Sequence, residues 1–214
     1  MSVNLREKTI PSSATLLTLA LVTLWSTRPT RAQNNCMSLA SSKACPAFDQ
    51  YYIGLGLADR YSYLAGANDV DSFDQKLFAY VNSTGDYLLP LGCSGNSKVA
   101  YARYSLSRLC VGLIQDASDS LPCNFQHNLT PPPLCQATCD AWIDSVAMIT
   151  NDTDVCADST QRSNGIADFQ SQCSSWQGYN GTDAGGCISG LVNEPGNCGK
   201  KRCGEASKAG PGLT

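Results

Sequence analysis

The chain has 214 residues, among them 15 basic and 18 acidic side chains, one histidine and 12 cysteines. This length suits one domain with a sizeable core. Residues 33–199 contain seven basic and 16 acidic side chains, and 15 of the acidic ones are Asp. Such a surface repels phosphate backbones, so the composition argues against nucleic-acid binding.

The first 32 residues predict a secretory signal peptide. An apolar run from Ala14 to Trp25 precedes small residues that offer a cleavage site after Ala32. The run is shorter than the roughly 20 residues that cross a bilayer, so it does not predict a membrane span. We expect a secreted protein with an extracellular domain at residues 33–199 and a disordered basic tail at residues 200–214.

All the cysteines follow the predicted signal peptide. An even number of cysteines in an exported chain is typical of a disulfide framework, although their spacing alone leaves the pairing open. The expected disulfide residues are Cys36, Cys45, Cys93, Cys110, Cys123, Cys135, Cys139, Cys156, Cys173, Cys187, Cys198 and Cys203. Four Asn-x-Ser/Thr sequons agree with secretion and predict glycosylation. They are Asn82, Asn128, Asn151 and Asn180.

The first strong helical pattern runs from Phe73 to about Val81. Its apolar residues recur at helical offsets, and Ser72 and Gln75 have the spacing of a capping box. A second helix is predicted within residues 99–114, with one apolar face. That face carries Ala102, Leu106, Leu109 and Leu113, and Cys110 lies close to it. Upstream, the sequence allows a short hairpin in residues 51–57 or 61–64.

The segment "PPPLCQATCDAW" predicts a third helix, with its prolines in the first turn. One apolar stripe contains both sulfurs and consists of Cys135, Cys139, Trp142, Ile143 and Val146. A weaker fourth helix is predicted to follow Ser163 or Asn164 and to turn Ile166, Phe169 and Cys173 inward. The later segments "GYNGTDAGGC" and "NEPGNCG" predict loops clamped by cysteines.

The Cys-x-x-x-Cys pair could serve a metal site, a redox site or two disulfides. Zinc sites need reduced thiolates and usually Cys-x-x-Cys or His partners, whereas this chain has one histidine and an export signal. Redox pairs normally read Cys-x-x-Cys. We therefore expect disulfide anchors, no metal and no cofactor.

No catalytic group stands out in the sequence. The single histidine, His127, lies in the predicted loop "CNFQHNLTPPP", and no nucleophile-elbow motif is present. Aspartates such as Asp71, Asp158 and Asp183 suit helix caps and turns. The segment "NDTDVCAD" at Asn151 lacks the glycine and distal Glu of a calcium loop. We expect a protein that is not an enzyme, although an Asp-centred hydrolase stays open as an alternative.

The clearest hint of a binding surface is a tyrosine-rich stretch that also contains Gly54, Gly56 and Gly66. Its rings could line a mobile rim, or half of them could pack in the core. The candidate rim residues are Tyr51, Tyr52, Tyr61 and Tyr63.

The order of the cysteines resembles the Frizzled-type cysteine-rich domain, a helical disulfide module shared in outline with folate- and riboflavin-binding proteins. The likeness covers Cys36 to Cys187, and its most specific part is the Pro-Pro-x-Cys-x-x-x-Cys element that contains Cys135 and Cys139. It implies a mainly α, small disulfide-rich helical domain with long loops. By rank order it also implies the pairs Cys36–Cys123, Cys45–Cys110, Cys93–Cys156, Cys135–Cys187 and Cys139–Cys173, with Cys198 left for Cys203.

Segments such as "CPAFD", "YARYSLSRLC" and "CISGLVNEPGNCG" are similar to ectodomains of fungal surface proteins, some of which continue into a membrane span. No membrane span or lipid-anchor tail follows in this sequence. Two interpretations stay open: the protein is a secreted form, or the gene product is longer than this sequence. The resemblance implies a non-enzymatic binding or sensing module at the cell surface or wall. Its partner would be a lipid, a wall glycan or a protein. A secreted effector or inhibitor is the alternative.

Overall fold

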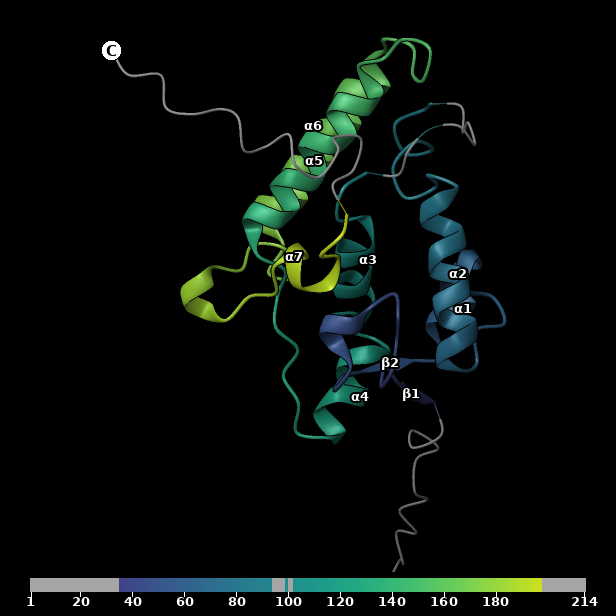
Figure 1. Ribbon diagram of the computed structural model, residues 1–214, viewed down its shortest axis with the longest axis vertical. Helices are drawn as coiled ribbons and strands as arrows, with labels where there is room; N and C mark the ends of the chain where they lie inside the picture. The colour runs from purple at the N-terminus through teal and green to yellow at the C-terminus, as the bar shows by residue number, and fades with distance from the viewer. Residues whose placement is uncertain (1–34, 94–98, 100–101, 198–214) are drawn as a thin grey trace, which may run out of the picture. The chain divides into compact units, whose positions relative to one another are not determined.

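The computed structural model describes residues 35–93, 99 and 102–197 (Figure 1). The predicted signal peptide and basic tail lie outside the described residues, and so do Cys198 and Cys203. The described part is mainly helical and is held by disulfides. Its elements, in chain order, are β1 (Cys36–Ser38), η2 (Pro46–Phe48), β2 (Tyr52–Gly54), α1 (Leu57–Arg60), η3 (Ser62–Leu64), α2 (Val70–Asn82), α3 (Ser105–Ile114), α4 (Ser120–Gln126), α5 (Gln136–Thr150), α6 (Thr160–Ser175), η4 (Asp183–Gly185) and α7 (Gly190–Asn193).

The two strands form an antiparallel ladder in which Met37 pairs with Ile53. The strand within residues 51–57 therefore pairs with β1 rather than with a neighbouring strand of a local hairpin, and residues 62–64 form a 3₁₀ turn. Helix α4 covers β2, where Asn124 accepts from Tyr52 N at 3.0 Å and donates to Tyr52 O at 2.8 Å. The side-chain amide of Asn124 thus pairs with both backbone polar groups of Tyr52, as a third strand would do.

Helix α2 begins three residues before the predicted start. Asp69 is its N-cap, and the capping box joins Asp69 to Ser72 rather than Ser72 to Gln75. The sequence prediction was wrong here because Asp is an equally good N-cap, and Ser72 can occupy the third helical position. The predicted apolar face of α2 is buried.

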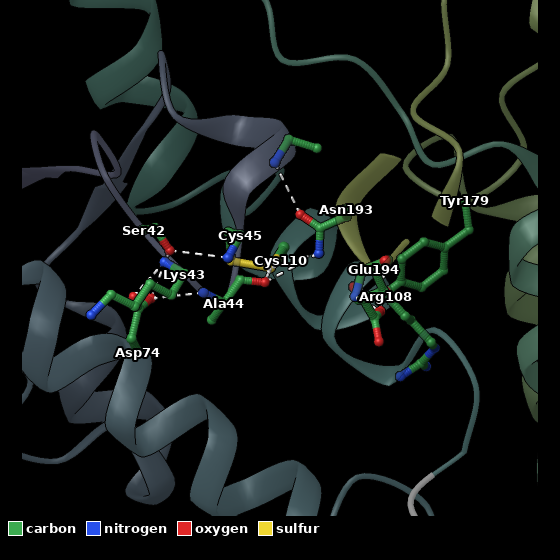
Figure 2. The surroundings of a disulfide bond; sticks show 12 residues. Ser42, Lys43, Ala44, Cys45, Asp74, Arg108, Cys110, Tyr179, Asn193 and Glu194 are labelled. Atoms are coloured by element: carbon green, nitrogen blue, oxygen red, sulfur yellow. Dashed lines mark hydrogen bonds between the residues drawn. A yellow bond between two sulfur atoms is a disulfide. The ribbon is translucent and has the colours of Figure 1, made fainter. Parts of the chain in front are cut away.

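Helix α2 also binds the loop at residues 42–44, which precedes Cys45, the disulfide partner of Cys110 in α3. Figure 2 shows the buried Asp74 beneath the loop that leads to Cys45. The carboxylate of Asp74 accepts from Ser42 Oγ at 2.6 Å and from the backbone N–H groups of Lys43 and Ala44. Three donors satisfy this buried charge, so it serves to fix the loop.

Helices α5 and α6 are the longest, and Figure 1 shows them side by side. The prolines precede α5 instead of forming its first turn, and Cys135 is its N-cap. The predicted stripe from Cys135 to Val146 is buried throughout. Helix α6 begins earlier than predicted because the hydroxyl of Ser159 accepts from Arg162 N and caps it.

Two short helices lie in or beside segments predicted as loops. Helix α4 ends at Gln126, within the segment predicted as a loop, and α7 lies between the two predicted cysteine-clamped loops and shares only Asn193 with the second. Asn193 explains the position of α7, because it accepts from Ala47 N and donates to Ala44 O, each at 3.1 Å. These contacts span almost the whole domain, so no local pattern predicts them.

The five disulfides of the described residues are the five pairs that the resemblance implied: Cys36–Cys123, Cys45–Cys110, Cys93–Cys156, Cys135–Cys187 and Cys139–Cys173. The Cys139–Cys173 bond joins α5 to α6, and Cys45–Cys110 attaches the start of η2 to α3. Disulfides at this density are typical of extracellular proteins. Within the described ranges, no helix has the length and apolarity that a membrane crossing requires.

Candidate binding site

A cavity of about 660 Å³ opens beside helix α3 and is walled by η3, α2 and the C-terminal end of α6. Its volume lies within the range of small-molecule sites. Aromatic rings, charged groups and neutral polar groups all contribute to the lining. The lining residues that determine its chemistry are Tyr61, Tyr63, Tyr80, Asp86, Arg108, Asp116, Gln172, Trp176 and Tyr179.

Three tyrosines form one wall of the cavity. The rings of Tyr63 and Tyr80 stack with centroids 3.9 Å apart, and Tyr61 leans on Tyr63 at 5.6 Å. The Tyr80 hydroxyl donates to Gly85 O, which anchors this wall to the loop after α2. Burial raises the pKa of Tyr63 and of Tyr80, so both phenols are neutral at physiological pH.

Trp176 and Tyr179 form a second aromatic part of the lining, just after α6 ends. Their rings meet edge to face with centroids 4.3 Å apart. Tyr179 is buried and its hydroxyl donates to Arg108 O, whereas 36% of Trp176 is exposed. Gly178 lets the indole fold back, because a Cβ there would lie 2.4 Å from the Trp176 ring. Trp176 is therefore the more exposed of the two rings of this wall.

Arg108 projects from α3 among aromatic rings. Its guanidinium carbon lies 4.0 Å from the centroid of Trp142 and 5.1 Å from that of Tyr179, and its Nη2 donates to Gln172 Oε1 at 2.9 Å. Such stacking holds a guanidinium in place while leaving its in-plane donors free. The buried Nε of Arg108 has no hydrogen-bond partner among the described residues.

Asp86 is the second charged group at the cavity and is 6% exposed. Its Oδ2 accepts from Ser105 Oγ at 2.6 Å, and Ser105 Oγ accepts from Trp142 Nε1 at 3.1 Å. The other oxygen, Oδ1, has no hydrogen-bond partner in the described part of the chain. Burial raises the pKa of Asp86 to about 6, although the Ser105 hydrogen bond and the Arg108 charge favour the ionised form.

A second carboxylate lies at the side of the cavity but is already occupied. Asp116 accepts from Arg60 at 2.7 Å and from the backbone N–H groups of Ser118 and Asp119. Burial acts in the other direction, but the hydrogen bond from Arg60 and those two N–H groups hold the pKa of Asp116 below its usual value. Asp116 is thus a charged, fully engaged part of the wall.

The four predicted rim tyrosines separate in space. Tyr61 and Tyr63 line the cavity, whereas Tyr51 packs in the core with 7% exposure. Tyr52 stacks on His127 with ring centroids 3.9 Å apart, between β2 and the end of α4. His127 therefore ends a helix against an aromatic ring and does not line the cavity.

The aspartates assigned to caps and turns lie at helix ends. Asp71 occupies the first turn of α2, Asp158 pairs with Arg162 at 2.7 Å, and Asp183 begins η4. Asp183 also approaches the sulfurs of Cys135 and Cys187. These two sulfurs are joined in a disulfide, so they supply no thiolate for a metal.

The sequon asparagines differ in exposure. Asn82, Asn128 and Asn151 are exposed, and Asn128 has a positive φ of 57°. Asn180 is half-buried beside the Trp176 wall, where its Nδ2 donates to Ser174 O at 3.4 Å. Glycosylation stays a prediction at all four.

Sequence reasoning missed the groups that give the cavity its polarity and its second wall. Asp86 and Arg108 have no local motif. Trp176 and Tyr179 follow α6, and Tyr179 lies in a segment expected to be a loop. Their spacing of three residues was the available signal, but it does not say which neighbour they face.

Comparison with known protein families, curated proteins and solved structures found no match. The function has to be argued from the cavity itself.

Proposed function

We propose that this protein is an extracellular, non-enzymatic binding module whose cavity holds a small ring-bearing, polar ligand. One observation carries the proposal: beside a cavity with two groups of aromatic rings, Asp86 Oδ1 and Arg108 Nε, an acceptor and a donor, are buried with no hydrogen-bond partner among the described residues. Unpaired buried polar groups are costly, and a ligand that offers both a donor and an acceptor removes that cost.

Among a lipid, a wall glycan and a protein, a glycan unit fits this chemistry best. A lipid tail would leave Asp86 and Arg108 unpaired in an apolar contact. A bound cation would meet Arg108, and a polyanion would meet Asp86 and Asp116, so a neutral ligand is favoured. Sugar rings carry neighbouring hydroxyls that both donate and accept, and aromatic faces suit their apolar sides.

The cysteine framework supports a Frizzled-type cysteine-rich domain, because the rank-order pairing of that family matches all five disulfides. A domain of this type at a fungal surface or wall would display its cavity to wall polymers. The same framework agrees with an oxidising, extracellular environment.

A hydrolase is the second candidate, because Asp86 and Asp116 share one cavity and their pKa values are shifted in opposite directions. Opposed shifts are typical of an acid and base pair. Against it, Asp116 is held by Arg60 and two backbone N–H groups, and Asp86 is tied through Oδ2 to Ser105. Binding is therefore the better-supported function.

The test uses the secreted protein purified from a host that forms disulfides. Oligomers of glucose and of N-acetylglucosamine are titrated while Trp fluorescence is recorded, with phospholipid vesicles in parallel. We expect at least one oligosaccharide to bind and to be recovered uncleaved. Asp86→Asn and Trp176→Ala should weaken binding at least about tenfold, because each removes one contact worth about 1.4 kcal/mol or more.

His127→Ala is the matched control, because this ring lies outside the cavity. Equal affinity of the cavity variants and the wild type would place the site elsewhere. Binding of vesicles alone would replace the glycan with a lipid, and cleaved oligosaccharide would indicate the hydrolase.

A further inference from the structure

We propose that Trp142 and Ser105 form a two-step hydrogen-bond relay that obliges Asp86 to present Oδ1 to the cavity, so that the ligand must supply an N–H or O–H to this oxygen. The inference rests on the proposed binding function of the cavity. It assigns two fully buried residues, neither of which lines the cavity, to ligand recognition.

The direction of the relay follows from the donors available. An indole N–H can only donate, so Ser105 Oγ must accept from Trp142 Nε1 at 3.1 Å. A hydroxyl has one proton, and that proton points to Asp86 Oδ2 at 2.6 Å. Oδ2 is therefore the acceptor while Asp86 is ionised. If Oδ2 carried a proton instead, Ser105 Oγ would accept from both Trp142 and Asp86, and the Ser105 proton would lose its acceptor among the described residues.

The relay decides where Asp86 takes up a proton. Because protonation at Oδ2 would cost the buried Ser105 proton its acceptor, Oδ1 is the favoured position for a further proton. Oδ1 is also the oxygen without a partner in the described chain. A ligand donor and a solvent proton thus compete for the same position, and binding requires the ionised carboxylate.

The other charged and titratable groups near Asp86 keep one state between pH 5 and 7. Arg108 on α3 stays positive. Burial raises the pKa of Tyr80, which lies on α2, and of Tyr87, which directly follows Asp86 in the sequence, so both phenols stay neutral. Elsewhere in the cavity lining, burial also raises the pKa of Tyr63 and of Tyr179. Asp116 has a lowered pKa and stays negative.

Nuclear magnetic resonance of the ligand-free protein tests the relay directly. Trp25 lies in the predicted signal peptide, so a secreted chain contains two indoles, and Trp176→Phe assigns their N–H signals. We expect the Trp142 N–H signal to shift with a midpoint near pH 6, because ionisation of Asp86 polarises Ser105. The shift should disappear in Asp86→Asn.

Ser105→Ala should uncouple the Trp142 signal from pH and raise the titration midpoint of Asp86, read from its carboxyl carbon. Ser171→Ala, a cavity-wall serine outside the relay, should change neither. A Trp142 signal that does not move between pH 4.5 and 8, about 1.5 to 2 units on either side of that midpoint, overturns the relay. The wild-type and Asp86→Asn titrations decide the question even if Ser105→Ala does not fold.

Benzamide and N,N-dimethylbenzamide test the ligand requirement, since they share a ring and an acceptor but only benzamide has N–H donors. We expect benzamide to shift the Trp176 signal at pH 7, to bind about tenfold more weakly at pH 5, and to bind more tightly than its dimethyl derivative. If benzamide binds equally well at both pH values, or if both amides bind equally well, the proposed requirement for a ligand donor at Oδ1 is wrong, while the cavity is still a binding site. Absence of any benzamide shift counts against the cavity as a binding site.

Discussion

Glu194 accepts hydrogen bonds of 2.7 Å from both the backbone N–H and the hydroxyl of Ser107, 87 residues earlier in the chain. Helix α3 begins after Tyr104, which has a φ of 66° and provides no side-chain cap. The first-turn N–H of Ser107 therefore depends on a carboxylate from the segment after α7. Figure 2 shows Glu194 beside α3, the helix that carries Ser107.

We expect Glu194→Ala to lower the free energy of unfolding by about 1–3 kcal/mol, because it leaves two buried donors unpaired. Glu194→Gln keeps an acceptor and should cost less. Urea denaturation measures both, and Val192→Ala, two residues away and 63% exposed in the wild type, is the control. If Glu194→Ala matched Val192→Ala, the cap would contribute no stability.

Asp86 should make the protein more stable in mild acid. Because burial raises its folded pKa to about 6, the folded state binds a proton that the unfolded chain has lost. The stability contributed by this group is complete below its unfolded pKa near 4 and is lost as pH rises through 6. Relative to Asp86→Asn, the wild type should lose about 2–3 kcal/mol between pH 4 and 7.

Asp69→Asn provides a control of opposite sign for this pH series. A backbone hydrogen bond from Ser72 lowers the pKa of Asp69, so its contribution is present above the unfolded pKa and is lost as pH falls. Thermal unfolding scans across the pH series measure all three proteins. A constant difference between the wild type and Asp86→Asn would contradict the raised pKa.

The disulfides should differ in their order of reduction. Both sulfur-bearing residues are fully buried in Cys45–Cys110 and Cys139–Cys173, whereas Cys187 is half-buried. Since exchange requires access to a sulfur, Cys135–Cys187 should open before these two. Limiting reductant, alkylation and peptide mapping report the order. Earlier loss of Cys45–Cys110 would show that the core opens more readily than its burial indicates.

Gly178→Ala should displace Trp176 from the cavity wall, because the new Cβ would lie 2.4 Å from its ring. Trp176 emission should then shift to the red and become more accessible to acrylamide, while the buried Trp142 supplies a constant background. Gly196→Ala, with no atom within 4 Å of the added carbon, is the matched control. Unchanged quenching in Gly178→Ala would show that the wall tolerates the methyl group.

The sequence by itself determined the local elements with strong periodicity. The stripe of Cys139, Trp142 and Val146 on α5 lies in the core as predicted, since helical spacing reports which face is buried. The sequence also indicated a disulfide framework, because the number of cysteines and the pattern of the predicted signal peptide can both be read without a structure. The cap of α2 was placed three residues late, since Asp and Ser are chemically equivalent there.

Only the tertiary structure decided which buried faces meet. Asp86 follows α2, Arg108 lies in α3 and Trp176 follows α6, and these separate segments form one cavity. No local pattern encodes that meeting, because each residue alone has an ordinary role on a helix or in a loop. Long-range disulfides and buried hydrogen bonds, such as that between Glu194 and Ser107, set how the helices pack. Within the described ranges, this packing leaves Asp86 Oδ1 without a hydrogen-bond partner.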